Sequence, residues 1–313
     1  MLISPPYNEY NLDGKTEVIV IDHLGGFNKN YQNVLLNQIS KSTFGGQIIT
    51  EYIFDNKIKN NYPTCNFLYS KDLWRKYNFI DDFLNYNIHP QIDYKNFICS
   101  FNGGAHVSRQ LLSSILNNQK YFDPEYTSKN FAYNDDYITG HLKNLDLSDS
   151  EIVLYLKFFT NNDEFNNSVY SFGHIRYEHN KNIYNLEHKL TQSFLHIVSE
   201  TMATSYYPFV TEKFLFSVVT RGLFVAYAQP GWHAHLEKYY GFKLYDKIFD
   251  YSFDSIQNPV KRLIKLIEMI SKFSKLSVDD WRDLYFVLEK DTIEYNYNHY
   301  FSGDYIKWLK EYE

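Results

Sequence analysis

Apolar and polar positions alternate along this chain in two ways, as short continuous apolar runs and as longer stretches with apolar residues at helical spacing. In the N-terminal part, the run 16–21 (Thr-Glu-Val-Ile-Val-Ile) is typical of a buried parallel strand. Shorter apolar runs predict strands at 46–54 and 65–69, and periodic stretches at 31–40 and 70–77 predict helices around them.

A strand and a helix separated by a glycine turn are predicted in the middle of the chain. The apolar run 97–101 leads into an Asn-Gly-Gly turn, and a helical pattern extends from about 106 to 117. The strand at 16–21 also runs into two neighbouring glycines, so the same unit occurs twice. Glycines at such a turn allow another group to approach the backbone closely.

The segment 118–180 carries a weaker pattern. It is polar and rich in asparagine, and it predicts one element, a helix over 148–158. Ser148 is placed to cap that helix, with Glu151 three residues further on completing a capping box.

From residue 194 onward the alternation of strands and helices is regular. The predicted elements are strand 194–200, helix 211–221, strand 223–228, helix 231–240 with Gly241 just after its end, and strand 242–245. Helices near 259–274 and 278–289, and one within 290–313, complete the chain. Because strands and helices alternate in two parts of the sequence, we predict an α/β fold with two parallel layers.

Composition limits the kind of protein that this chain can be. Its 313 residues suffice for two domains of ordinary size. A net charge of −6 and a pI of about 6.0 do not favour nucleic acid as a partner. The only two cysteines, Cys65 and Cys99, exclude a disulfide scaffold or a cysteine-based zinc site. No signal sequence or transmembrane segment is predicted, so we expect a cytoplasmic protein.

The start of helix 211–221 combines groups that suit an anion and a sugar. Lys213 supplies a positive charge, Glu212 can accept hydrogen bonds from hydroxyls, and the unpaired N–H groups of a helix start favour anions. Because Glu212 and Lys213 are adjacent, we expect their side chains to point about 100° apart and to address two different groups. Taken alone, such a pair is an ordinary feature of a helix's first turn.

The stretch from 194 to 228 resembles the nucleotide-sugar motif of fucosyltransferase-like glycosyltransferases of the GT-B architecture. In that family a strand of the type FxxxFENS leads to DYxTEKF and then to GxVPVVxG. The matching stretches here are Phe194-Leu-His-Ile-Val-Ser-Glu200-Thr201, Phe209-Val-Thr-Glu-Lys-Phe214 and Gly222-Leu-Phe-Val-Ala-Tyr-Ala228. The unit 97–109 also resembles the family's strand, asparagine turn and arginine. Where the family has Glu-Asn-Ser, this chain has Glu200-Thr201-Met202, so the donor's sugar and base do not carry over.

The resemblance implies two Rossmann-like domains that face each other across a cleft. We expect an N-terminal acceptor-side domain over 1–180 and a C-terminal domain over 181–313 that binds the nucleotide sugar. Residues 97–117 would contribute to the donor site from the first domain. Ligands of open α/β sheets bind outside the carboxyl ends of the strands, which agrees with this arrangement.

The resemblance also implies roles for individual side chains. Glu212 would hold the ribose, and Lys213 and Arg109 the diphosphate. Apart from the resemblance, Tyr206 and Tyr207 directly precede the helix start and are placed to stack on the base. The complete set of expected donor-binding residues is Arg109, Glu200, Tyr207, Thr211, Glu212 and Lys213.

The acceptor hydroxyl needs a general base at the carboxyl end of an N-terminal strand. Asp22 and His23 directly follow the strand 16–21 and are the expected catalytic residues. An Asx turn that ends this strand explains Asp22 equally well, and Asp81, Asp82 and Glu51 are alternatives.

No metal or separate cofactor is expected, only a nucleotide-diphospho sugar as co-substrate. The chain has no Asp-x-Asp motif, so side-chain cations are the expected partners of the leaving diphosphate. His233 and His235 are spaced i and i+2, which places them about 200° apart on a helix and unable to converge on one ion.

The expected function is therefore inverting, metal-independent transfer of a hexosyl or pentosyl group to a hydroxyl of a glycan or another acceptor. One alternative is a viral enzyme in the host cytoplasm that glycosylates 5-hydroxymethylpyrimidine in DNA. A basic strip would favour that acceptor (Lys57, Lys59, Lys71, Arg75 and Lys76), whereas the net charge of −6 opposes it. A second alternative is a nucleotide-binding relic without catalytic activity.

Overall fold

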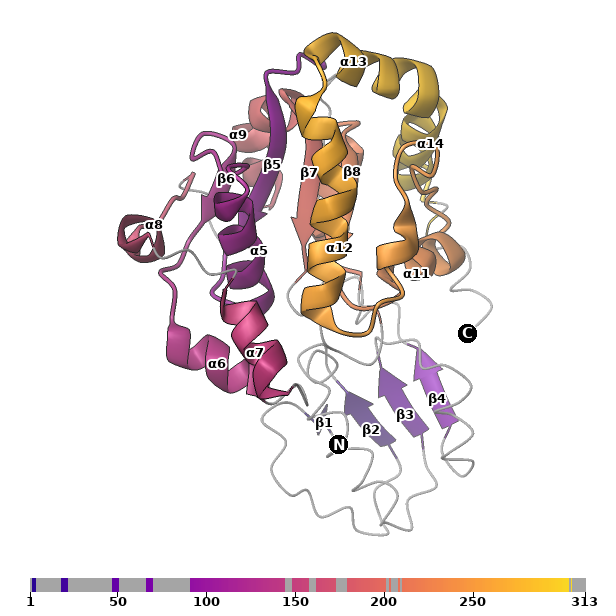
Figure 1. The fold of residues 1–313 in the computed structure, drawn as a ribbon. Helices are drawn as coiled ribbons and strands as arrows, with labels where there is room; N and C mark the ends of the chain where they lie inside the picture. The colour runs from indigo at the N-terminus through magenta and orange to yellow at the C-terminus, as the bar shows by residue number, and fades with distance from the viewer. Residues whose placement is uncertain are drawn as a thin grey trace.

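The computed structural model describes residues 91–143, 148–157, 162–172, 179–200, 203, 208, 210–303 and 305, together with four N-terminal strands (Figure 1). These strands are β1 (Leu2–Ile3), β2 (Val18–Ile21), β3 (Gln47–Thr50) and β4 (Asn66–Tyr69), which pair in parallel in that order. The strands predicted at 16–21, 46–54 and 65–69 are thereby confirmed, with tighter bounds. The helices expected at 31–40 and 70–77 lie outside the described residues.

A second parallel sheet organises the rest of the chain. Its strands are β5 (Asn96–Asn102), β6 (Thr127–Lys129), β7 (Ser193–Ser199) and β8 (Leu223–Tyr227). They lie in the order β6-β5-β7-β8, so the chain runs outward in one direction from β5 and in the other direction from β7. The class is therefore α/β, as predicted. The domain boundary expected between 180 and 181 falls between β5 and β7, which are hydrogen-bonded neighbours in this sheet.

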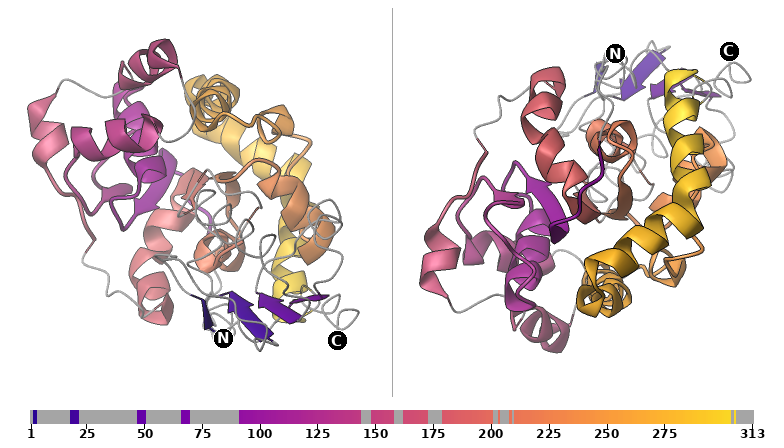
Figure 2. Two further views of the ribbon diagram at one scale, coloured as in Figure 1. Left: turned by 90° about the horizontal axis from the view of Figure 1, so that it is seen from below. Right: turned by 90° about the horizontal axis from the view of Figure 1, so that it is seen from above.

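Helices cover both faces of the second sheet. In Figures 1 and 2, α5 (Val107–Asn118) and α12 (Pro259–Ser271) lie on one face, and α9 (His179–Thr191) lies on the other. The short helix α10 (Leu215–Val219) packs with α9 and α14. The remaining α-helices of the described residues are α6 (Asp135–Lys143), α7 (Asp149–Leu156), α8 (Asp163–Asn167), α11 (Trp232–Tyr240), α13 (Val278–Asp283) and α14 (Lys290–Phe301).

Local sequence signals explain where several helices begin and end. Ser148 and Glu151 form the predicted capping box of α7. Asn258 caps α12 by accepting hydrogen bonds from two backbone N–H groups, and Pro259 occupies the first helical position. Gly241 ends α11 in the left-handed conformation with φ 73°, as its position in the sequence predicts.

The strand predicted at 242–245 is wrong. The backbone N–H of Lys243 donates to the side-chain carbonyl of Asn296 on α14, and the Asn296 amide donates back to the carbonyl of Lys243 (2.8 and 2.9 Å). One buried amide side chain thus satisfies the backbone groups that a neighbouring strand would otherwise pair. An apolar run alone does not reveal this replacement.

Aromatic side chains close the amino end of the second sheet. Phe97 and Phe194, near the starts of β5 and β7, stack on Trp281 of α13 with ring centroids 5.8 and 5.5 Å apart. The Trp281 indole N–H donates to the carbonyl of Phe273 (2.9 Å). Large rings with their polar atom satisfied make this end a packed part of the core.

The buried ring of His196 on β7 requires a glycine beside it. Its Nε2–H donates to the Leu190 carbonyl (2.8 Å) and its Nδ1 accepts from the Ser217 hydroxyl (2.9 Å). A Cβ atom at Gly222 would lie 2.1 Å from this ring. Since both ring nitrogens are held, the ring cannot move aside.

Replacing Gly222 with alanine should therefore destabilise the fold. We expect Gly222→Ala to lower the free energy of unfolding by about 3 kcal/mol or more, the upper part of the range for overpacking. The matched control is Gly140→Ala in α6, where the added Cβ would meet nothing within 4 Å beyond its chain neighbours and the backbone of its own helix. Gly140→Ala should be neutral or stabilising by about 1 kcal/mol. Urea denaturation measures both, and equal effects would contradict the assigned clash.

His196 should also make stability depend on pH. Burial lowers the pKa of His196 to about 4 from its ordinary value of 6.5. Above pH 6.5 the ring is neutral in both states, whereas between about 6.5 and 4 only the unfolded chain takes up the proton, so stability falls as pH falls. From pH 7 to 4.5 the wild type should lose about 2 to 3 kcal/mol more than His196→Gln. Parallel denaturation curves at both pH values test this, and identical losses would contradict it.

Candidate functional site

The turn after β5 and the residue after β7 meet at the carboxyl end of the second sheet. The hydroxyl of Ser108, in the first turn of α5, donates to the backbone carbonyl of Glu200 (3.3 Å). Glu200 directly follows β7. The strand order reverses between β5 and β7. Doubly wound sheets bind their ligands at this point of reversal, outside the carboxyl ends of the strands. The topology therefore brings Arg109 and Glu200, 91 positions apart in the chain, to the place where a ligand is expected.

Glu200 is a buried carboxylate held by Thr211. Only 1% of Glu200 is exposed. The backbone N–H of Thr211 donates to Oε1 (3.2 Å), and the Thr211 hydroxyl donates to Oε2 (2.6 Å). Burial is the largest influence on the pKa of Glu200 and raises it, against the lowering effects of Lys213 and the Thr211 hydrogen bonds. The charge of Glu212 raises this pKa further.

Lys213 joins the same group of side chains. Its Nζ donates to the Thr211 hydroxyl (3.0 Å) and lies 3.9 Å from Oε2 of Glu200 and 3.4 Å from Oε1 of Glu212. The expectation that Glu212 and Lys213 point apart is therefore wrong. The four-carbon stem of lysine lets its ammonium turn back to both carboxylates, although the two Cα–Cβ bonds diverge. The Lys213 and Glu212 side chains are 25% and 13% exposed, so this pair is the part of the group nearest to water.

Arg109 approaches this group from α5. It is 6% exposed, and its Nη1 lies 3.0 Å from where a Cβ atom at Gly104 would be. The glycine of the turn after β5 thus leaves room for the guanidinium. Burial lowers the pKa of Arg109, while the charges of Glu200 and Glu212 raise it. Arg109 therefore lies within electrostatic reach of both carboxylates.

The helix predicted over 211–221 is shorter and irregular. Glu212–Phe214 form a 3₁₀ turn, η2, capped by the Thr211 side chain, and α10 contributes five residues after it. Arg221 adopts the left-handed conformation (φ 53°) at the end, with its guanidinium 3.6 Å from the ring centroid of Tyr297. Because few peptides are aligned in these short helices, their dipole is weak. Binding of an anion here therefore depends on the charges of Arg109 and Lys213.

Several expected site residues lie outside the described residues. These are the expected catalytic residues Asp22 and His23, the expected base-stacking residue Tyr207, the alternative bases, and the basic strip. Five of the six expected donor-binding residues are described, namely Arg109, Glu200, Thr211, Glu212 and Lys213, and all five lie together at the carboxyl end of the second sheet.

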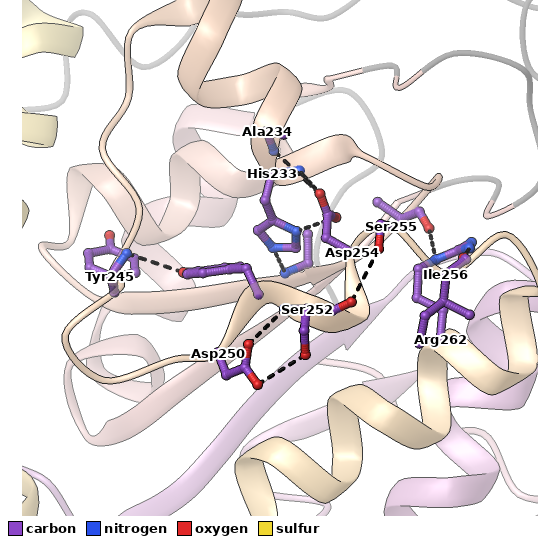
Figure 3. A network of polar contacts seen from close by, with 12 residues as sticks. His233, Ala234, Tyr245, Asp250, Ser252, Asp254, Ser255, Ile256 and Arg262 are labelled. Carbon is purple, nitrogen blue, oxygen red and sulfur yellow. Dashed lines mark hydrogen bonds and ion pairs between the residues drawn. The ribbon is translucent and has the colours of Figure 1, made fainter.

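His233 has a structural role beside this edge (Figure 3). Its Nδ1–H donates to Asp254 (2.7 Å), and its Nε2 accepts from the backbone N–H of Ala226 in β8 (3.0 Å). Burial raises the pKa of Asp254, but hydrogen bonds from His233 and Ala234 outweigh it and leave the pKa lowered. Within the described part of the chain, no group of three or more His, Cys, Asp or Glu side chains could hold a metal ion.

Sequence reasoning missed Arg262, which ties the loops at this edge together. Arg262 is 1% exposed; its Nε donates to the carbonyl of Ala228 (3.0 Å) and its Nη2 to that of Ala203. Its Nη1 donates to the carbonyl of Ile256 in the loop before α12 (Figure 3). The same nitrogen also donates to the carbonyl of Gln257 (3.2 Å). The available signal was its helical register with Leu266 and Ile270 on the buried face of α12.

Lys129 was also missed, because β6 is too short and polar to be predicted from hydrophobicity. Its Nζ lies 4.7 and 4.5 Å from the ring centroids of Tyr133 and Phe165. Burial lowers the pKa of Lys129 to about 8. Cation–π contacts of this kind stabilise a desolvated ammonium. Lys129 thereby anchors the segment around α8 to the edge of the sheet.

Comparisons with protein-family models, curated protein sequences and solved structures found no match to this chain. The resemblance to fucosyltransferase-like enzymes therefore stays a prediction from its motif residues. In the part of the chain that the structure describes, no helix has both the length and the apolar character needed to cross a membrane.

Proposed function

We propose that this chain binds the diphosphate of a nucleotide at the carboxyl ends of β5 and β7 and transfers a sugar from it. In this proposal Lys213 and Arg109 meet the diphosphate and Glu212 accepts hydrogen bonds from the ribose. A second Rossmann-like domain, containing β1 to β4, supplies the acceptor site across a cleft, with Asp22 or His23 as the general base.

In the proposed reaction the acceptor oxygen forms a bond to the anomeric carbon as the bond from that carbon to the β-phosphate oxygen breaks. The general base takes the acceptor's proton, and the nucleoside diphosphate leaves with the bonding electron pair. Negative charge grows on the β-phosphate during this step. Fixed cations beside it stabilise the transition state more than the ground state, which is how they accelerate transfer.

One observation carries the diphosphate part of this proposal. Two cationic side chains from different elements, Arg109 of α5 and Lys213 of η2, lie with two carboxylates at the point where the strand order reverses. Sheets of this topology bind phosphorylated ligands at that point. Sugar transfer depends in addition on the family resemblance of 194–228.

A ligand screen tests the binding proposal directly. We expect a nucleoside diphosphate to raise the thermal unfolding temperature of the full chain, since a ligand that binds only the folded state stabilises it. UDP, GDP, ADP, dTDP and, as a monophosphate reference, CMP form the panel. Slow release of the free nucleoside diphosphate from the matching nucleotide sugar would identify an enzyme. Binding of the nucleotide without such release would identify an inactive relic. No shift with any member would contradict the binding proposal.

Substitution of the two cations tests their assigned roles. We expect Lys213→Ala and Arg109→Ala each to reduce the transfer or donor-hydrolysis rate by about 10²–10³-fold, the usual effect of removing one preorganised charge-stabilising group. Lys261→Ala is the matched control, because Lys261 is an exposed lysine of α12 whose Nζ pairs with Glu151. Wild-type turnover in either site variant would contradict the assignment, as would an equal loss in the control.

A further inference from the structure

The charges at the candidate site balance, although the proposed ligand is an anion. Within the described chain, Glu200 faces Arg109 from α5, and Glu212 and Lys213 from η2. Two cations and two carboxylates sum to zero when all four are ionised. A diphosphate adds at least two negative charges to this group. Those charges balance the two cations by themselves, so binding is favoured when each of the two carboxylates moves away or loses its charge.

Glu212 can move away, whereas Glu200 cannot. The Glu212 side chain is 13% exposed and lies on a 3₁₀ turn beside water. Glu200 is 1% exposed and fixed through both oxygens by the N–H and hydroxyl of Thr211. A buried carboxylate that cannot reach water relieves repulsion by taking up a proton.

Lys213 links the binding of the diphosphate to the protonation of Glu200. Its ammonium now lies near Oε2 of Glu200 and donates to the Thr211 hydroxyl. When the ammonium turns toward a diphosphate, Glu200 loses the cation that lowers its pKa and gains a negative neighbour. Both changes favour the protonated form of this carboxyl, which burial already favours.

We propose that Glu200 takes up one proton from solvent when a diphosphate binds, so that the site's affinity for the anion falls as pH rises. This inference rests on the proposed diphosphate-binding function and deepens it. The proton adds to Oε2 of Glu200, which then donates to the Thr211 oxygen instead of accepting from it. The Thr211 hydroxyl keeps its hydrogen but no longer donates it to Glu200, so it can donate a hydrogen bond to the ligand. Glu200 is thus a positioning residue that sets the state of Thr211 and Lys213.

Calorimetric titration with inorganic pyrophosphate tests this step. Binding heats of the full chain, measured at one pH in buffers of different ionisation enthalpy, give the number of protons taken up. Pyrophosphate itself titrates, so the wild type is compared with Glu200→Gln, whose amide has the shape of a protonated carboxyl. We expect the wild type to take up more protons than Glu200→Gln, by up to one proton per bound pyrophosphate. Its affinity should fall more steeply with rising pH, by at most tenfold per pH unit beyond the fall in the variant.

Glu212→Gln is the matched control, since it removes the exposed carboxylate of the same group. Because the charge of Glu212 helps to raise the pKa of Glu200, this variant should take up fewer protons than the wild type but still more than Glu200→Gln. Equal uptake by the wild type and Glu200→Gln would overturn the role of Glu200 while leaving diphosphate binding intact. No binding of pyrophosphate by any variant at any pH would overturn the binding proposal as well. If Glu200→Gln does not fold, the wild-type uptake is compared with that calculated from the titration of free pyrophosphate.

Discussion

The parallel pairing of β5 with β7 is the constraint on which the described structure depends. It joins segments separated by the whole of the polar region 118–180, and it creates the point at which the strand order reverses. Because the two strands are parallel, their carboxyl ends lie at the same edge of the sheet, and the turns after both strands open there. Without this pairing, Arg109 and Glu200 would have no reason to be neighbours.

The two ends of the second sheet are built from different chemistry. At the amino end, Phe97, Phe194 and Trp281 stack and exclude water. At the carboxyl end, hydrogen bonds of the buried Arg262 hold the loops after β7 and β8 to the start of α12. Packed apolar rings supply stability without specific chemistry, whereas satisfied polar networks fix backbone groups in place. This division leaves the carboxyl end as the part of the sheet suited to a ligand.

The sequence predicted the elements whose signals are local. Periodic apolar positions and caps located α7, α11 and α12, and continuous apolar runs located β5, β7 and β8. It failed where a distant side chain decides the local structure, as Asn296 does for the backbone of Lys243. Five of the donor-binding residues were chosen from motif order. Their convergence followed from strand order, whereas the contact between Lys213 and Glu212 depends on side-chain conformation, which the helical angle between neighbours does not determine.

The balance of charge at the candidate site explains why its cations can stay ordered before any ligand arrives. An unpaired Arg109 at this depth would carry a large desolvation cost, and the charges of Glu200 and Glu212 offset part of it. The same carboxylates compete with any anion that binds later. A site of this kind binds through exchange of partners, in which the entering phosphate oxygens replace carboxylate oxygens around fixed cations. The free energy of binding then depends on whether each displaced carboxylate moves into water or takes up a proton. Because Glu200 is buried, its protonation affects this free energy most.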